Sequence, residues 1–266
     1  MSRIRKRSNE LMTFGGHLQV FRQMLFRIIS IMTVIAGVVF CSKETTWNLL
    51  MAPSEWDFCT YRCLEQFMQE MGIDFHFEEF HVNMIATDLS SQFMTHITTS
   101  IYLGLLGASP YILYEIFRFI TPALYENERK YSVQVAGIIY LLFLLGVLMS
   151  YFVLFPISFR FLGTYSVSAK VVSNITLDSY ISTFVSLTLV MGIVFQLPVI
   201  AFFLAKLGFV THEILEDYRK HAFIAIMLLA AIITPPDLMT LILVTIPLYL
   251  LYEVSISVVK IVQRQT

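Results

Sequence analysis

The chain has 266 residues, of which 57% are hydrophobic and only 14% are charged. Soluble globular domains are nearer half apolar and a quarter charged, so this composition excludes an ordinary soluble fold. It indicates a single polytopic membrane domain over residues 1–266. The basic start at residues 3–7 is not evidence of nucleic-acid binding, because basic residues beside a membrane helix usually hold that end in the cytoplasm.

The N-terminal region predicts a retained membrane helix and no cleavable signal peptide. Polar residues 8–10 follow the basic start, the first long apolar run begins near Ile28, and no small-x-small cleavage site follows that run. Residues 1–23 are expected to form a cytoplasmic basic tail and an amphipathic lead-in at the interface, separated by Gly15 and Gly16. The first span is expected over residues 24–41.

Residues 42–90 are expected to form the first extracytoplasmic loop. They are acidic and aromatic and contain only two strong bases. We expect a helix near residues 60–71, extended chain near residues 73–85, and a break in the chain at Pro53.

The three cysteines, Cys41, Cys59 and Cys63, lie at or beyond the far end of the first span. A disulfide among them is one interpretation if that side is oxidising, and small, partly buried side chains are the other. This loop supplies too few ligands at set spacing for a metal site, so no metal and no cofactor is predicted.

Three further spans are expected over residues 93–119, 133–155 and 180–204. The first of these is weakly hydrophobic, so its polar face should meet other helices or water, with His96 as a satisfied bundle histidine. The last is expected to be interrupted by Gln196 and Pro198.

A charged loop at residues 205–221 precedes the last apolar run, which residues 234–237 divide into two helices joined by a tight extracytoplasmic turn. Both helices are expected to be short. The first, over residues 222–233, would rise only about 20 Å, against a hydrocarbon core of about 30 Å. Residues 260–266 are expected to form a cytoplasmic tail.

Six spans result, and the placement of Lys and Arg sets their orientation. With the N-terminus inside, fourteen basic residues fall on the cytoplasmic side and four on the other. The four are Lys43, Arg62, Arg160 and Lys170. Both termini are therefore predicted to be cytoplasmic.

Residues 109–130 stand out because they are too polar for lipid and too aromatic for a passive loop. Pro110 and Pro122, which with Pro53 we interpret as structural prolines, bracket about three helical turns. A docking surface at the membrane face is predicted here, with a cytoplasmic recognition loop at residues 119–131 and Glu128 as its charged contact.

Several segments together resemble the TatC family of twin-arginine translocase subunits, in the right order and spacing. They are residues 84–90 (MIATDLS), 109–114 (SPYILY), 119–129 (FITPALYENER), 151–156 (YFVLFP), 192–198 (GIVFQLP), 234–237 (TPPD) and 246–253 (IPLYLLYE). The resemblance implies a concave, glove-shaped bundle of six transmembrane helices in the bacterial cytoplasmic (inner) membrane. It also implies a non-enzymatic receptor that binds the twin-arginine signal peptides of folded precursors and organises TatA- and TatB-like single-span partners, driven by the proton-motive force.

Carried over residue by residue, the resemblance assigns signal-peptide binding to Glu128, Phe119 and Arg22. The chemistry agrees, because a guanidinium is best met by a carboxylate and an aromatic face. The alternative is that Glu128 only pairs with Arg129 or Lys130 at the surface. Glu126 lies nearby in sequence and could share the role.

The chain departs from the family pattern at Val20, where a second signal-binding carboxylate is expected. Either Glu10 compensates for this change or recognition depends more heavily on Glu128. A further departure is Leu241, which stands where some members carry Gln in a polar cluster near Thr234.

The resemblance places Gln196 at a position facing the concave cavity, where an amide can bond a passing peptide without the cost of a buried charge. The alternative is a Gln bonded to a neighbouring helix. Glu253 is expected to be either a partner-binding or a structural carboxylate. Thr234 and Asp237 are the candidate docking residues for the TatA- and TatB-like subunits.

The sequence offers two other function classes. An ion-coupled secondary transporter of a small solute is the alternative, suggested by the broken helices and by Gln196 and Glu253, but repeated halves are not visible. An intramembrane enzyme is set aside, because the six histidines include no His-Glu-x-x-His pair and the chain has no Gly-x-Ser-x-Gly.

Overall fold

The computed structural model describes residues 14–73, 79–80, 82–120, 132–166, 168 and 174–265, and within them the fold is helical. The N-terminal half comprises α1 Phe14–Cys41, α2 Lys43–Met51, the short 3₁₀ helix η1 Ala52–Ser54, α3 Cys59–Glu70, β1 Met84–Ile85 and α4 Ser91–Ile120. The C-terminal half comprises α5 Ser132–Met149, the π-helical η4 Ser150–Leu154, α6 Phe155–Thr164, β2 Ile175–Thr176, α7 Leu177–Val194, α8 Leu197–Lys206, α9 His212–Asp217, α10 Arg219–Ile233 and α11 Leu238–Gln265. The predicted all-α membrane class is confirmed.

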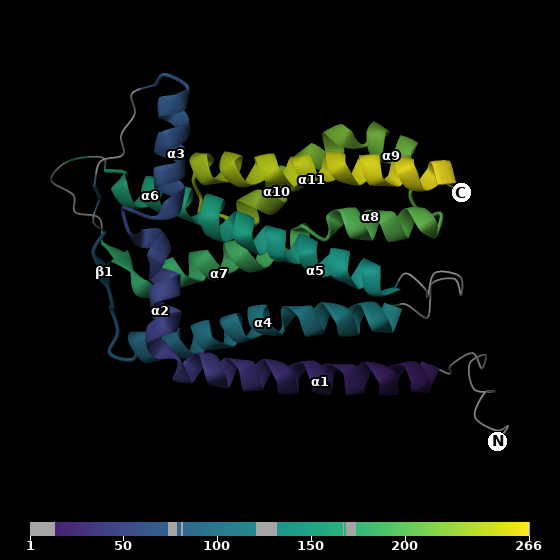
Figure 1. Ribbon diagram of the computed structural model, residues 1–266, viewed down its shortest axis with the longest axis horizontal. Coiled ribbons are helices and arrows are strands. Elements are labelled where there is room, and N and C mark those ends of the chain that lie inside the picture. Colours follow the sequence, from purple (N-terminus) through teal and green to yellow (C-terminus); the bar gives the residue numbers. More distant parts are fainter. Residues whose placement is uncertain are drawn as a thin grey trace.

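The long helices lie side by side along one direction (Figure 1). The packed pairs are α1 with α4, α4 with α7, α5 with α7, α8 with α11, and α10 with α11. The side of the bundle at which α1 starts and α11 finishes is called the terminal end. The opposite side, which carries α2 and α3, is called the α2–α3 end. The first and last helices therefore start and finish on the same side of the bundle.

Five helical segments of the described chain are long and apolar enough to cross a membrane. They are Leu18–Cys41, Ser91–Phe119, Val135–Thr164, Leu177–Lys206 and Leu238–Arg264. The remaining predicted span corresponds to α10, whose 15 residues rise only about 22 Å. This helix is too short to meet the same length criterion, so the count of six membrane spans stays a prediction.

The last two helices are not both short, because α11 has 28 residues. Its C-terminal turns pack inside the molecule, where Val259 and Val262 are buried, and His212 of α9 donates its backbone N–H to Gln263 at 3.0 Å. Since nothing after Pro247 interrupts the helix, it continues through most of the segment expected to be a tail.

The N-terminal lead-in also differs from expectation. Helix α1 is continuous from Phe14 to Cys41, so Gly15 and Gly16 lie inside it and the lead-in continues directly into the span. Neither glycine is enough to end a helix, because each costs only about 1 kcal/mol relative to alanine.

The prolines have different effects on the helices that contain or follow them. Pro53 lies in the 3₁₀ turn that follows α2, as predicted, and Pro198 follows the predicted break between α7 and α8. Pro110 lies inside α4 and does not end it. The predicted end of the third span near Pro156 is wrong, because η4 widens the helix just before this residue and the helix continues as α6.

Two buried tyrosines fasten the α2–α3 end to the helices beneath it. The Tyr61 hydroxyl donates to the Pro156 carbonyl at 2.8 Å, and the Tyr180 hydroxyl donates to the Leu50 carbonyl at 2.7 Å. Burial raises the pKa of Tyr61, and the nearby guanidinium of Arg160 offsets part of that rise. These bonds join α2 and α3 to α6 and α7.

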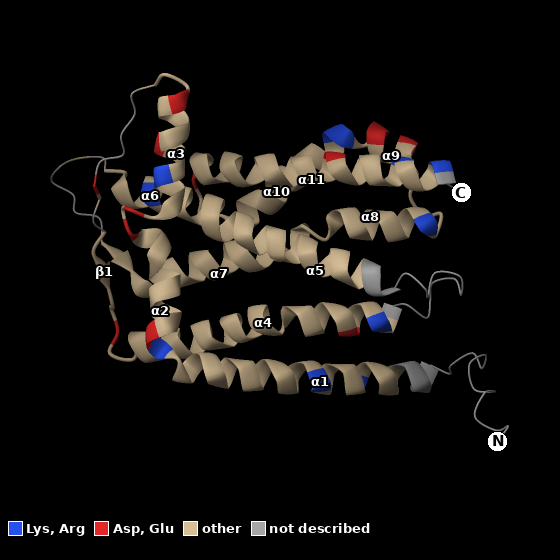
Figure 2. Cartoon of the chain, in the orientation of Figure 1, with Lys and Arg blue, Asp and Glu red and all other residues tan. Residues whose placement is uncertain are grey.

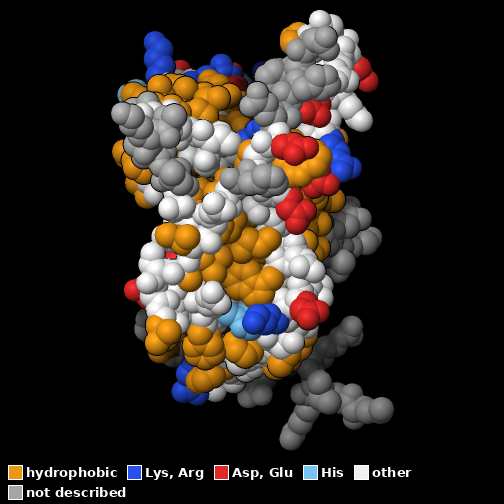
Figure 3. All heavy atoms as spheres, turned by 90° about the vertical axis from the view of Figure 1, so that its left-hand side faces the viewer, with side chains coloured by type: hydrophobic (Ala, Val, Ile, Leu, Met, Phe, Trp, Pro, Cys, Tyr) orange, Lys and Arg blue, Asp and Glu red, His pale blue; other side chains and the backbone are white. Residues whose placement is uncertain are grey.

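The α2–α3 end is otherwise close to the prediction. The expected helix near residues 60–71 is α3. Among the described residues of the expected extended chain, Met84–Ile85 form a strand that pairs in parallel with Ile175–Thr176. Residues 74–78 and 81 lie outside the described chain. Acidic side chains gather on this face around hydrophobic ones (Figure 3). The three cysteines are free and exposed.

Candidate functional site

The helices α1 and α4 approach each other closely, and this contact positions the polar residues near the terminal end. A Cβ atom added at Gly104 of α4 would lie 2.7 Å from the Cβ of Ala36 and 2.9 Å from its Cα. Small residues allow such close contact between membrane helices. Further along the pair, the polar face predicted for the second span is largely buried, at Thr95, Thr99 and Ser100.

Phe119, a predicted signal-peptide residue, lies at the last turn of α4 against Phe21 of α1, with ring centroids 5.8 Å apart. Arg22, the next residue of α1, is exposed. The start of the predicted recognition loop is therefore placed beside the helix segment that carries Arg22. Glu128 lies outside the described residues, as do Pro122 and Glu126.

A buried carboxylate lies one turn deeper along α4. The side chain of Glu115 is 6% exposed, and Nη1 of Arg27 on α1 approaches its Oε1 at 3.2 Å. The Tyr111 hydroxyl donates to the same oxygen at 3.0 Å, and Nη1 of Arg118 lies 3.7 Å from it. Four side chains from two helices thus form one polar cluster, which we call the Glu115 cluster: Arg27, Tyr111, Glu115 and Arg118. Figure 2 shows where charged residues lie on these two helices.

The partnership between Glu115 and Arg27 was not predicted from the sequence, because the two residues stand 88 positions apart in the chain. The available signal was that an ionisable residue in an apolar helix must have a partner. The identity of that partner depends on helix packing. Val20, at the family's carboxylate position, is 40% exposed, and Glu10 lies outside the described residues.

Gln196 lies at the break between α7 and α8 and donates through Nε2 to the Ile139 carbonyl of α5 at 3.1 Å. The side-chain nitrogen of Gln196 is therefore bonded to a neighbouring helix, as the alternative interpretation of this residue predicted. Its Oε1 is buried without a hydrogen-bond partner among the described residues. The amide oxygen is thus an acceptor that a further donor could reach.

Glu253 of α11 is paired within the chain, which favours its structural interpretation. Nη2 of Arg219, at the start of α10, lies 3.0 Å from Glu253, and the Tyr249 hydroxyl donates to the carboxylate at 3.1 Å. The same guanidinium lies 3.5 Å from Glu216 of α9. The Glu253 carboxylate therefore helps to join α9, α10 and α11.

The candidate docking residues of the turn at 234–237 are also satisfied internally. Asp237 accepts the backbone N–H of Thr240 at 2.7 Å and its hydroxyl, and so caps α11. The Thr234 hydroxyl donates to the Ala230 carbonyl at 2.9 Å. Leu241, the departure from the polar cluster, packs against the hydrophobic core.

His96 is not the fully satisfied histidine that was expected. Its ring stacks on Phe40 with centroids 4.3 Å apart, but its Nε2 is buried without a hydrogen-bond partner among the described residues. Stacking on an apolar ring excludes water from this face without supplying a polar partner.

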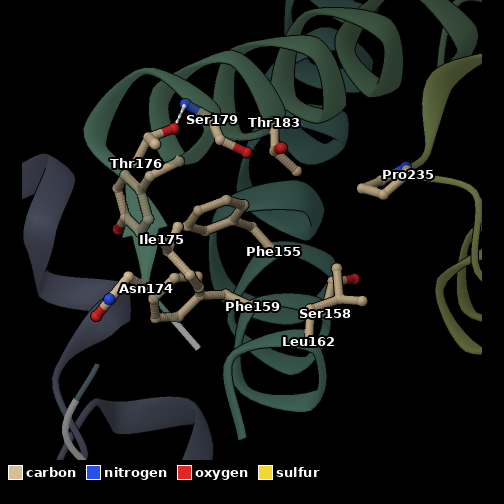
Figure 4. Close-up of a pocket in the computed structure, with 11 residues that line it drawn as sticks. Phe155, Ser158, Phe159, Leu162, Asn174, Ile175, Thr176, Ser179, Thr183 and Pro235 are labelled. Atoms are coloured by element: carbon tan, nitrogen blue, oxygen red, sulfur yellow. Dashed lines mark hydrogen bonds between the residues drawn. The ribbon is translucent and has the colours of Figure 1, made fainter. Parts of the chain in front are cut away.

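A cavity of about 400 Å³ lies at the α2–α3 end between α6, α7 and the turn at 234–237 (Figure 4). Phe155 and Phe159 contribute aromatic rings to its lining, and Ser158 and Thr183 contribute hydroxyls. None of the described residues that line this cavity is charged. The described lining therefore offers hydroxyls and aromatic rings but no carboxylate for a guanidinium.

Taken together, the long apolar helices and their packing define a multi-pass helical membrane protein. The family model described as Sec-independent protein translocase protein (TatC) matches residues 16–247. The chain therefore belongs to the TatC family. This finding confirms the resemblance seen in the sequence and gives no support to the transporter alternative.

Individual relatives agree. The TatC protein of Blattabacterium sp. subsp. Periplaneta americana is 33% identical over 257 residues, covering 95% of this chain and 97% of that protein. TatCy of Bacillus subtilis is 37% identical over 180 residues, covering 68% of this chain and 71% of that protein. A crystal structure described as the twin arginine translocase receptor TatC matches with a TM-score of 0.74 and 30% identity, over 93% of this chain and 99% of that one.

Proposed function

We propose that this chain is the receptor and scaffold subunit of a twin-arginine translocase. It binds the signal peptides of folded precursor proteins and organises TatA- and TatB-like single-span subunits for export driven by the proton-motive force. Within the TatC family, the observation that supports this role here is the contact between Phe119 and Phe21, which brings the first residue of the predicted recognition loop to the helix that carries Arg22.

The recognition chemistry follows from the residue types. The Glu128 carboxylate accepts a forked pair of hydrogen bonds from a signal-peptide guanidinium, while the Phe119 ring offers its face to the cation. Arg22 cannot attract another arginine, so its role is to hold the recognising carboxylate in place. Because Val20 supplies no second carboxylate, Glu128 carries most of the recognition.

The proposed location is the bacterial inner membrane, with both termini in the cytoplasm. The excess of Lys and Arg on one side supports this orientation. So does the arrangement in which α1 begins and α11 ends at the same end of the bundle (Figure 1). The loops at residues 119–131 and 205–221 then face the cytoplasm, where precursors first arrive.

We place partner docking on α10 and the adjoining turn with Thr234 and Asp237. Since the polar groups of this turn are already bonded within the chain, the attraction for a partner helix comes mainly from apolar surface. On α10 that surface includes Ile224, Leu228 and Ile232, which are 66%, 64% and 76% exposed. Close helix packing, including copies of this chain within the complex, would then hold the assembly together.

Signal-peptide crosslinking tests the recognition role. A twin-arginine peptide carrying a photo-reactive group should crosslink to the full chain in membranes, and Glu128→Ala should abolish the crosslink. Glu213→Ala, an exposed carboxylate at the start of α9, is the matched control and should leave it unchanged. Val20→Glu should preserve or strengthen it. Undiminished crosslinking in Glu128→Ala would refute the role assigned to this residue.

A further inference from the structure

The Glu115 cluster carries more positive than negative charge. Two guanidiniums, those of Arg27 and Arg118, share the single carboxylate of Glu115, which leaves a net charge of +1 on these three residues. The carboxylate is buried, whereas the side chains of Arg27 and Arg118 are 46% and 62% exposed. The excess charge therefore lies on the outer side of the cluster.

The depth of the cluster makes this excess charge costly. Arg27 lies 14 residues before Cys41, the last residue of α1, which corresponds to about 21 Å along the helix. That distance falls within the roughly 30 Å hydrocarbon thickness of a bilayer. A cation at such a depth requires an opposite charge or access to water.

The surface beside the two arginines is apolar and exposed. Phe26 and Ile29 of α1 are 64% and 52% exposed, and Tyr114, one turn before Arg118 on α4, is 48% exposed. An anion that meets the guanidiniums together with this surface needs hydrocarbon attached to it. A phospholipid has both parts, whereas a free phosphate has only one.

We propose that Arg27 and Arg118 form a binding site for the headgroup of an anionic phospholipid between α1 and α4. Guanidiniums form strong, often paired hydrogen bonds with phosphate oxygens, and basic sites between membrane helices bind such headgroups. Glu115 and Tyr111 orient the arginines, and the acyl chains lie along the exposed apolar side chains. The site is independent of signal-peptide recognition.

The test measures lipid preference with the purified full chain. Native mass spectrometry in detergent, with equal amounts of phosphatidylglycerol and phosphatidylcholine added, should show a preference for phosphatidylglycerol of about tenfold, the equivalent of one charge-assisted hydrogen bond. The double variant Arg27→Gln/Arg118→Gln should reduce this preference to near unity, whereas Arg27→Lys/Arg118→Lys should keep part of it. Arg62→Gln, which removes an exposed ion pair with Asp57 at the other end, is the matched control and should change nothing.

Glu115→Gln separates lipid binding from a purely structural role. It raises the net charge of the cluster from +1 to +2, while the glutamine amide oxygen can still accept a hydrogen bond from an arginine. The preference should therefore hold or increase, and a loss of preference would refute the role of the excess positive charge. Soluble glycerol phosphate, added at the same concentration as the lipid, should not displace phosphatidylglycerol from the protein. Displacement by glycerol phosphate would refute the requirement for acyl chains. A preference that survives in the double glutamine variant would refute the site.

Discussion

The close contact between α1 and α4 leads to a specific stability prediction for Gly104→Ala. The new Cβ would lie 2.7 Å from the Ala36 Cβ and 2.9 Å from both its Cα and its backbone nitrogen. Carbon atoms in ordinary contact are about 3.5–4.0 Å apart, so the two helices would have to separate by roughly 1 Å at this point. Two of these three atoms belong to the backbone and cannot rotate away.

The expected magnitude follows from two opposing terms. Overpacking of this kind costs about 1–3 kcal/mol, while replacing glycine by alanine inside a helix returns about 0.5–1 kcal/mol. The net loss should be about 1–2 kcal/mol, which lowers the melting temperature by a few degrees. The separation should also lengthen the ion pair between Arg27 and Glu115.

Thermal unfolding followed by circular dichroism in one detergent provides the assay. Gly37→Ala is the matched control, because this glycine lies on α1 next to Ala36 and an added Cβ there meets nothing within 4 Å. It should be neutral or slightly stabilising. If Gly104→Ala melts at or above the temperature of Gly37→Ala, the inferred close packing of α1 on α4 is refuted.

Further predictions concern the buried tyrosine and the α9–α11 ion pairs. Tyr61→Phe should lower stability by about 1–3 kcal/mol, because it leaves the buried Pro156 carbonyl without this donor. Since burial raises the pKa of Tyr61 above its ordinary value of about 10, only the unfolded chain ionises as pH rises past that value, and the stability contribution is lost. The advantage of the parent chain over Tyr61→Phe in melting temperature should therefore shrink above about pH 10; a constant advantage would contradict this. Arg219→Gln should cost about 1 kcal/mol more than Arg62→Gln, because it removes a partly buried contact with Glu253 and a second contact with Glu216 instead of one exposed pair. The reverse order in thermal melts would contradict this reasoning.

Several features were predictable because they depend on neighbouring residues. Apolar runs of about 20 residues indicate membrane spans, and five segments of the described chain meet that criterion. Proline chemistry placed the turn after α2 and the break at Gln196, and the order of short motifs predicted the family. Local composition was also enough to predict α3.

Other boundaries could not be predicted, because packing overrides local signals. Pro156 is tolerated within a continuous helix because η4 widens the chain before it. Helix α11 extends past Val259 because its last turns pack inside the molecule. Glycines alone could not end α1 at its start.

The sequence by itself determined the membrane class, the approximate spans and the TatC family, since these depend on hydrophobicity and on motifs read along the chain. Only the tertiary structure decided which ionisable groups meet. Glu115 and Arg27 stand 88 positions apart, and no periodicity joins them. They pair because Gly104 and Ala36 let α1 and α4 approach closely enough for one carboxylate to reach guanidiniums from both helices.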